Sequence, residues 1–385
     1  MARWKFQTWS PEVAFVAALV ISIVMALHAP GVVQGDEKGF LYYGTMQAEM
    51  FVGCVGGDDQ ACVDWRWAEP YEGYGSHNPK LGLYMLGVVD HATRGLPVQH
   101  RVPAMRLVWA LMGALCVGGL ALLARNDRAR AGGIMAGVLL LGHPVFRACQ
   151  VALLPDLPML LFVLAALLCA QKGLAARRVG QGLWLMDAGA LAGLAVATKL
   201  YALALLPVLL LMVIVGWRKV GWRGWLGLML GLAVGLLVFV GTNPYLWHHP
   251  QEALRAMTAG HVLAQHGTLT GIGTGMDSLR FLAWLPFSMP LVPPLNSRSE
   301  IMGLGPIWIT WFGVMISAIG LVMHILRRRW LPVVFLVSTF ALTAWVITRF
   351  EPSWLYPRAF LLPSVAAVWL ASCVLDGLGP PAGGR

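Results

Sequence analysis

Long apolar runs separated by short polar breaks extend along almost the whole chain. Each run is close to the roughly 20 residues that an α-helix needs to cross a bilayer. The pattern predicts about ten membrane-spanning helices. Their expected centres are Leu19, Met112, Leu139, Val163, Leu191, Val208, Ala233, Val314, Phe335 and Val365. We therefore expect an all-α polytopic membrane protein.

The breaks between the runs predict the domain organisation. Because most breaks are short, we expect one transmembrane domain over residues 1–376, followed by a disordered tail at 377–385. The opening run is too long for a cleaved signal peptide, so it is expected to remain as a span. Two longer stretches, at 31–102 and 242–300, are expected to be outer loops. The first contains short apolar segments such as "LGLYMLGVV", which predict helices lying at the membrane interface.

Composition and charge placement narrow the class of protein. The chain is 58% hydrophobic and 12% charged, which is more apolar surface than a soluble protein can hide. Its net charge of +10 comes largely from clusters of Lys and Arg in alternate breaks. By the positive-inside rule these breaks and both termini are cytoplasmic, whereas the acid-rich 31–102 loop faces outside. Nucleic-acid binding is excluded because it needs a continuous basic face.

Carboxylates at the outer membrane surface are the first candidates for chemistry. Asp36 and Glu37 follow the first apolar run directly, and Asp156 opens the fourth span on the same side. Acids at such places commonly bind cations or take part in proton transfer. The alternative is that they cap helix N-termini. If Asp36 and Asp156 hold a metal, oxygen ligands of this kind suit Mg²⁺ or Mn²⁺.

Further polar residues gather on the outer side. They are His77 and Lys80 in "GYGSHNPKLG", Tyr245 and His248 in "GTNPYLWHHP", and the cations Lys199 and Arg358 at outer span ends. A cation at this depth suits a lipid phosphate. The alternatives are a solvated turn, an aromatic interface belt and snorkelling cations. The sequence contains no nucleotide-binding motif, so we expect no nucleotide cofactor.

Two cysteines, Cys54 and Cys62, bracket "VGGDDQA" in the first outer loop. A disulfide between them is expected if that side of the membrane is oxidising. The alternative is two free thiols in a mobile loop.

Taken in order, these motifs resemble those of glycosyltransferase family 39. Its members are polyprenyl-phosphate-dependent enzymes of the C-type membrane fold and include protein O-mannosyltransferases and the lipid A aminoarabinose transferase. The family's Asp-Glu pair is matched by Asp36-Glu37, and its acid opening the fourth span by Asp156. Its His/Lys-Pro-Pro-Leu element resembles "HNPKLG", and two further motifs resemble "TNPYLWHHP" and "PRAFLLP". The resemblance covers residues 11–370.

The resemblance implies an inverting transfer of a sugar from a polyprenyl-phosphate-linked donor to an acceptor hydroxyl, at the outer face of a bacterial inner membrane. Asp36 would be the general base, while Glu37 and Asp156 would position the acceptor or a divalent metal. Lys199 and Arg358 would hold the donor phosphate. The site would be ordered by His77, Lys80, Tyr245 and His248. Many relatives carry an added outer domain without a counterpart here, so protein, lipid and glycan acceptors stay open.

Two other classes of function stay open. A transporter or flippase for a lipid-linked or small polar substrate would also place acids near membrane spans. The middles of the expected spans are nearly free of charge, which favours surface chemistry over a conduction path. A membrane scaffold would use Asp36 and Asp156 only as helix caps.

Overall fold

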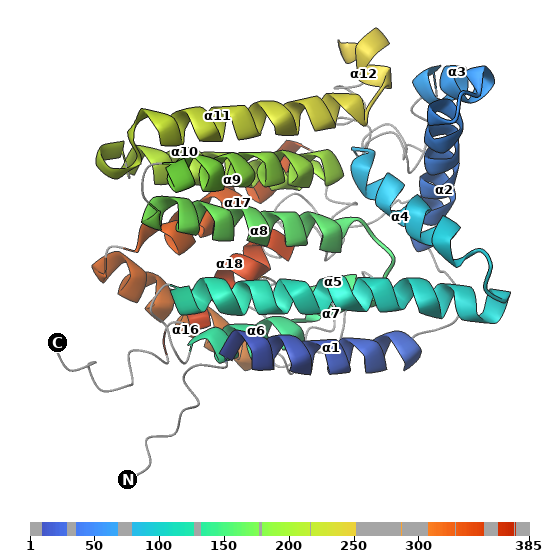
Figure 1. Ribbon diagram of the computed structural model, residues 1–385. Coiled ribbons are helices and arrows are strands. Elements are labelled where there is room, and N and C mark those ends of the chain that lie inside the picture. The colour runs from blue at the N-terminus through green and yellow to red at the C-terminus, as the bar shows by residue number, and fades with distance from the viewer. Residues whose placement is uncertain are drawn as a thin grey trace.

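The structure is a computed structural model that describes residues 10–28, 36–67, 79–126, 132–176, 179–215, 217–251, 286, 307–327, 329–349, 361–372 and 374. Throughout this part of the chain the regular structure is helical (Figure 1). The helices are α1 (Ser10–His28), α2 (Asp36–Val55), α3 (Asp59–Trp67), α4 (Leu81–Thr93), α5 (Val98–Asn126), α6 (Gly132–Gly142), α7 (Pro144–Val151), α8 (Asp156–Ala175), α9 (Val179–Thr198), η2 (Leu200–Ala204), α10 (Leu205–Val215), α11 (Trp217–Gly241), α12 (Tyr245–His248), α16 (Ile307–Leu326), α17 (Trp330–Arg349) and α18 (Leu361–Ser372).

Four of the described helices contain segments long and apolar enough to cross a membrane. The segments are Pro11–His28, Gln99–Asn126, Asp156–Ala175 and Val220–Gly241. Shorter apolar stretches lie in α6, in η2 and α10, and in α16, α17 and α18. The all-α polytopic architecture is therefore confirmed. The number of ten spans stays a prediction, because parts of the chain, including the 377–385 tail, lie outside the described residues.

Two expected spans are interrupted. The run centred near Leu139 is divided into α6 and α7 at His143. Pro144 explains the division, because proline lacks an N–H group and fits the first turn of a new helix. The run centred near Val208 begins as the 3₁₀ helix η2 before it continues as α10. Apolar content alone predicts neither interruption.

Glycines let α9 and α11 pack closely. Gly182, Gly189 and Gly193 of α9 face Gly227, Gly231 and Gly235 of α11. A Cβ atom on Gly193 would lie 2.1 Å from the Cα of Gly235, so the two backbones touch. Because lipid offers no hydrophobic driving force between helices, small residues stabilise such pairs by allowing close van der Waals contact.

The core lies between α5, α8 and their neighbours, and it fixes the segment that leads into α8. Trp109 of α5 is fully buried. Its indole Nε1 donates a hydrogen bond of 2.9 Å to the carbonyl of Leu154, two residues before α8 begins at Asp156. The start of α8 is therefore anchored to α5.

The helices α2 and α4 lie at one end of the bundle, and α2 runs roughly across its long helices (Figure 1). They cross at two glycines, where a Cβ on Gly87 would lie 2.2 Å from the carbonyl oxygen of Gly44. This arrangement agrees with the interfacial helices expected in the first outer loop.

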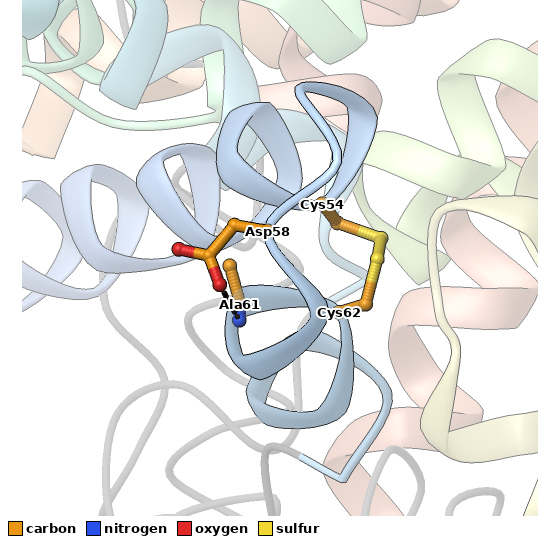
Figure 2. The surroundings of a disulfide bond; sticks show 4 residues. All are labelled: Cys54, Asp58, Ala61 and Cys62. Atoms are coloured by element: carbon orange, nitrogen blue, oxygen red, sulfur yellow. Dashed lines mark hydrogen bonds between the residues drawn. A yellow bond between two sulfur atoms is a disulfide. The ribbon is translucent and has the colours of Figure 1, made fainter.

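A disulfide joins the end of α2 to α3 (Figure 2). It links Cys54 with Cys62, which are eight residues apart. Between them Asp58 accepts a hydrogen bond of 3.0 Å from the backbone N–H of Ala61, so it caps the N-terminus of α3. Of the two alternatives for these cysteines, the structure contains the bridge.

The contact between α9 and α11 leads to a stability prediction. Gly193→Val should destabilise the protein by about 1–3 kcal/mol, because the new side chain collides with backbone that cannot move aside. Thermal unfolding of the purified protein in detergent measures the effect. Gly241→Ala is the matched control, since a Cβ there meets nothing within 4 Å. Equal melting temperatures for the two variants would contradict this description of the interface.

Candidate functional site

The starts of α4 and α8 and the end of α9 converge on one small region. A Cβ on Gly82, in the first turn of α4, would lie 2.5 Å from Cβ of Pro155 and 3.0 Å from Cγ2 of Thr198. Pro155 directly precedes Asp156, and Thr198 directly precedes Lys199. A glycine is required at this approach, and it brings the start of α4 against the residues that precede the two charged residues.

Asp156 and Lys199 form a buried ion pair. The Lys199 Nζ atom lies 2.5 Å from Oδ1 of Asp156, and the two side chains are 7% and 1% exposed. Lys199 also lies over the ring of Tyr201, 5.5 Å from its centroid. The first turn of α8 favours a negative charge at Asp156 through the helix dipole. The second carboxylate oxygen, Oδ2, is buried and has no hydrogen-bond partner among the described residues.

Lys80, at the start of α4, is the second buried cation of this region. Lys80 is 6% exposed, and its ammonium group forms no hydrogen bond or ion pair within the described part of the chain. Burial lowers the pKa of Lys80 from its usual value to about 8. An ammonium group held without a counter-ion provides a ready contact for an anionic ligand.

Asn243 ties α4 to the end of α11. Its Oδ1 accepts a hydrogen bond of 3.1 Å from the backbone N–H of Lys80. Its Nδ2 donates a hydrogen bond of 2.6 Å to the carbonyl of Phe239, which fixes the orientation of the Asn243 amide. The "HNPKLG" and "GTNPYLWHHP" motifs, 163 residues apart at this contact, therefore meet through one hydrogen bond. We call Lys80, Asp156, Lys199 and Asn243 the buried polar site.

The structure describes the side chains of only some of the predicted site residues. Asp36 and Glu37 form the first turn of α2, about 12 Å along the helix from the crossing at Gly44. Their side chains, like those of Tyr245 and His248 in α12, lie outside the described residues, as do His77 and Arg358 altogether. Of the predicted residues, the structure brings together Asp156, Lys199 and Lys80.

Sequence reasoning missed the partner of Lys199. The sequence suggested that this cation holds a donor phosphate, whereas the structure places its ammonium group on Asp156. Two isolated opposite charges at the same expected membrane depth were the available signal for the pair. Asn243 and Gly82 were also missed, because their roles depend on contacts with residues far along the chain.

A divalent metal does not fit the residues that are described. Within the described part of the chain, no three His, Cys, Asp or Glu side chains gather in one group. Oδ1 of Asp156 already holds the Lys199 ammonium, which would repel a second cation at that carboxylate. We therefore derive no step through a metal, and a metal ligand at Asp36 stays a prediction.

Comparison with known proteins gives a family match over part of the chain. Residues 98–248, which include Asp156, Lys199 and Asn243, match the family model described as dolichyl-phosphate-mannose-protein mannosyltransferase. No curated protein matches the chain in sequence. The sequence-based resemblance and this family match point to the same group of enzymes.

Two solved structures of one enzyme share the fold. ArnT from Cupriavidus metallidurans in the apo state aligns with a TM-score of 0.59 and 20% identity, over 96% of this chain and 60% of ArnT. The same enzyme bound to undecaprenyl phosphate aligns with a TM-score of 0.53 and 20% identity, over 97% and 61%. The chain thus has the C-type glycosyltransferase membrane fold and spans about three-fifths of the length of ArnT.

The ion pair generates a prediction about stability. Lys199→Met should destabilise the protein by about 3–5 kcal/mol, because it leaves the carboxylate of Asp156 buried without a counter-ion. Adding Asp156→Asn should restore most of that loss. Thermal unfolding of the single and double variants in detergent tests both statements.

Lys80→Met is the matched control, because it removes an equally buried cation that has no described counter-ion. We expect its stability to be unchanged or raised. A Lys199→Met protein as stable as Lys80→Met would show that the pair with Asp156 is unimportant for folding.

Proposed function

We propose that the protein transfers a sugar from a polyprenyl-phosphate-linked donor to an acceptor hydroxyl at the outer face of the membrane. The observation that carries the proposal is the buried Lys80, which has no described counter-ion, at the start of the helix that packs on the residues preceding Asp156 and Lys199. It lies on the fold of an enzyme that binds undecaprenyl phosphate. The family match over residues 98–248 supports the same activity. Sugar–phosphate cleavage supplies the driving force, so the reaction needs no nucleotide.

Lys80 is the group best suited to the donor phosphate. Its charge has no described partner, whereas that of Lys199 is neutralised by Asp156. Negative charge grows on the phosphate as the sugar leaves, and a fixed cation in a poorly solvated place stabilises that change strongly. Arg358, outside the described residues, is proposed as the second phosphate contact. Lys199 instead holds the carboxylate of Asp156 in place.

The chemical step uses Asp36 as general base. The acceptor hydroxyl gives its proton to the Asp36 carboxylate while its oxygen bonds to the anomeric carbon of the sugar. The bond from that carbon to the phosphate oxygen breaks, polyprenyl phosphate leaves, and the sugar configuration inverts. Glu37 and Asp156 position the acceptor, and the free Oδ2 of Asp156 is able to accept a hydrogen bond from it. His77, Tyr245 and His248 order the surroundings.

The proposed location is a bacterial inner membrane, with the site on the outer side and both termini in the cytoplasm. Basic residues in alternate breaks support this orientation. The Cys54–Cys62 bridge in the outer segment supports an oxidising compartment on that side. A flippase for a lipid-linked substrate is the alternative, and it would move label across vesicle membranes without sugar transfer.

The base assignment gives a direct test. Asp36→Asn should lower kcat by about 10²–10⁴-fold, the range that a positioned proton acceptor contributes. Binding of polyprenyl phosphate should stay unchanged, because Lys80 is intact. Transfer of a radiolabelled sugar to acceptor measures kcat, and Glu37→Gln is the adjacent control with a smaller expected loss. Wild-type turnover in a purified Asp36→Asn protein would exclude Asp36 as the base.

The lowered pKa of Lys80 predicts the pH dependence. With a pKa of about 8, Lys80 is roughly nine-tenths protonated at pH 7 and loses its charge above pH 8. Because only the cation attracts phosphate, kcat/KM for the donor should fall about tenfold per pH unit above pH 8.

Two variants separate Lys80 from other titrating groups. Lys80→Arg should abolish the alkaline fall, since guanidinium stays charged. Lys80→Met should weaken donor binding at every pH. An alkaline fall that persists in both variants would assign it to another residue and remove Lys80 from the phosphate site.

A further inference from the structure

A second buried carboxylate, Asp90 of α4, lies outside the buried polar site. The residue is 2% exposed, and both of its oxygens are engaged. Oδ1 lies 2.5 Å from Nη2 of Arg101, while Oδ2 accepts a hydrogen bond of 2.9 Å from the Thr45 hydroxyl. Oδ2 is also 3.5 Å from Nε of Arg94.

These contacts join three helices. Thr45 belongs to α2 and Arg101 to α5, while Arg94 directly follows α4 and also pairs with Glu49 of α2. The two acids and the two arginines cancel in charge, so a carboxylate can be buried here at modest cost. We call Thr45, Glu49, Asp90, Arg94 and Arg101 the Asp90 cluster.

The Asp90 cluster lies at the crossing of α2 and α4. Thr45 follows Gly44, whose backbone touches Gly87 of α4. From the crossing at Gly44, α2 runs back about 12 Å to Asp36, at 1.5 Å per residue. A change of 10° in the crossing angle would therefore move the start of α2 by about 2 Å.

The two crossing helices are not held equally. The start of α4 has its own anchors, because Gly82 packs on Pro155 and Thr198 and the backbone of Lys80 binds Asn243. Two side chains of α2 bind the C-terminal end of α4: Thr45 donates to Asp90, and Glu49 pairs with Arg94. Loss of the cluster would therefore loosen α2 from the end of α4, while the separate anchors keep Lys80 in place.

We propose that Asp90 is a positioning residue, which sets the angle of α2 so that Asp36 reaches the acceptor hydroxyl. This inference rests on the proposed function. Proton transfer requires donor and acceptor within hydrogen-bond distance, and a misplacement of about 1 Å can cost a factor of 10² in rate. The value of kcat should therefore depend on the angle between α2 and α4. Donor binding should instead depend on Lys80, which the separate anchors of α4 hold in place.

The test compares Asp90→Asn and Thr45→Val with the wild type. Asp90→Asn removes the charge that pairs with both arginines, and Thr45→Val removes only the hydrogen bond from α2 while leaving the ion pairs intact. Asp64→Asn on α3 is the control, because its carboxylate accepts from Gln60 of its own helix. Three quantities are measured: kcat and KM for the donor, the stoichiometry of polyprenyl phosphate binding, and hydrogen exchange of α2 amides.

We expect kcat to fall at least tenfold in Asp90→Asn and by a smaller factor in Thr45→Val. Donor KM and binding stoichiometry should stay at wild-type values, which shows that the molecules are folded. Exchange in α2 should become faster in both variants, and Asp64→Asn should match the wild type throughout.

Other outcomes overturn the proposal. Unchanged kcat and unchanged α2 exchange would show that Asp90 does not fix α2. A fall in kcat matched by lost binding stoichiometry in both variants would show a role in folding only. A wild type without sugar transfer would refute the proposed function, and α2 exchange would then still decide whether Asp90 holds the helix.

Discussion

The buried charge at the start of α8 constrains the helices packed around it. An isolated carboxylate with 1% exposure would cost several kcal/mol, and Lys199 offsets that cost from the break between α9 and η2. The pair thereby joins the start of α8 to the end of α9. Helix α4 then packs through Gly82 on the residues that precede both charges. With Lys199 committed to Asp156, Lys80 is the cation of this site, among the described residues, that stays available to an anionic ligand.

The architecture of the chain could largely be predicted from its sequence. Runs of apolar residues carry the length that a bilayer requires, and α1, α5, α8 and α11 follow that length. Which helices touch could not be predicted, because lipid-facing and helix-facing surfaces are both apolar. Gly193 and Gly235 are an example, since their contact depends on backbone shape and cannot be predicted from hydropathy. The interruption at His143 depends on Pro144, and apolar content does not predict it either.

The candidate site was only partly accessible from the sequence. The sequence marked Asp156 as a candidate at an expected outer span end, because a lone charge in an apolar stretch is unusual. The roles of Lys80 and Lys199 could not be separated, since both are cations at similar depth. Only the 2.5 Å contact between Lys199 and Asp156 distinguishes the occupied cation from the available one. The Asp90 cluster could not be predicted either. In the sequence Arg94 and Arg101 look like ordinary loop charges, and nothing there shows that both bind Asp90.

The hydrogen bond from residue 80 to Asn243 has a consequence for how such a site can diversify. Asn243 contacts the backbone N–H of that position and leaves the side chain free of any architectural duty. Any residue except proline supplies the same N–H, so the docking of α4 survives exchange of the group that it carries. Ligand preference and helix placement are therefore separable at this position. A scaffold of this kind can adopt a new headgroup chemistry through one codon without losing its fold.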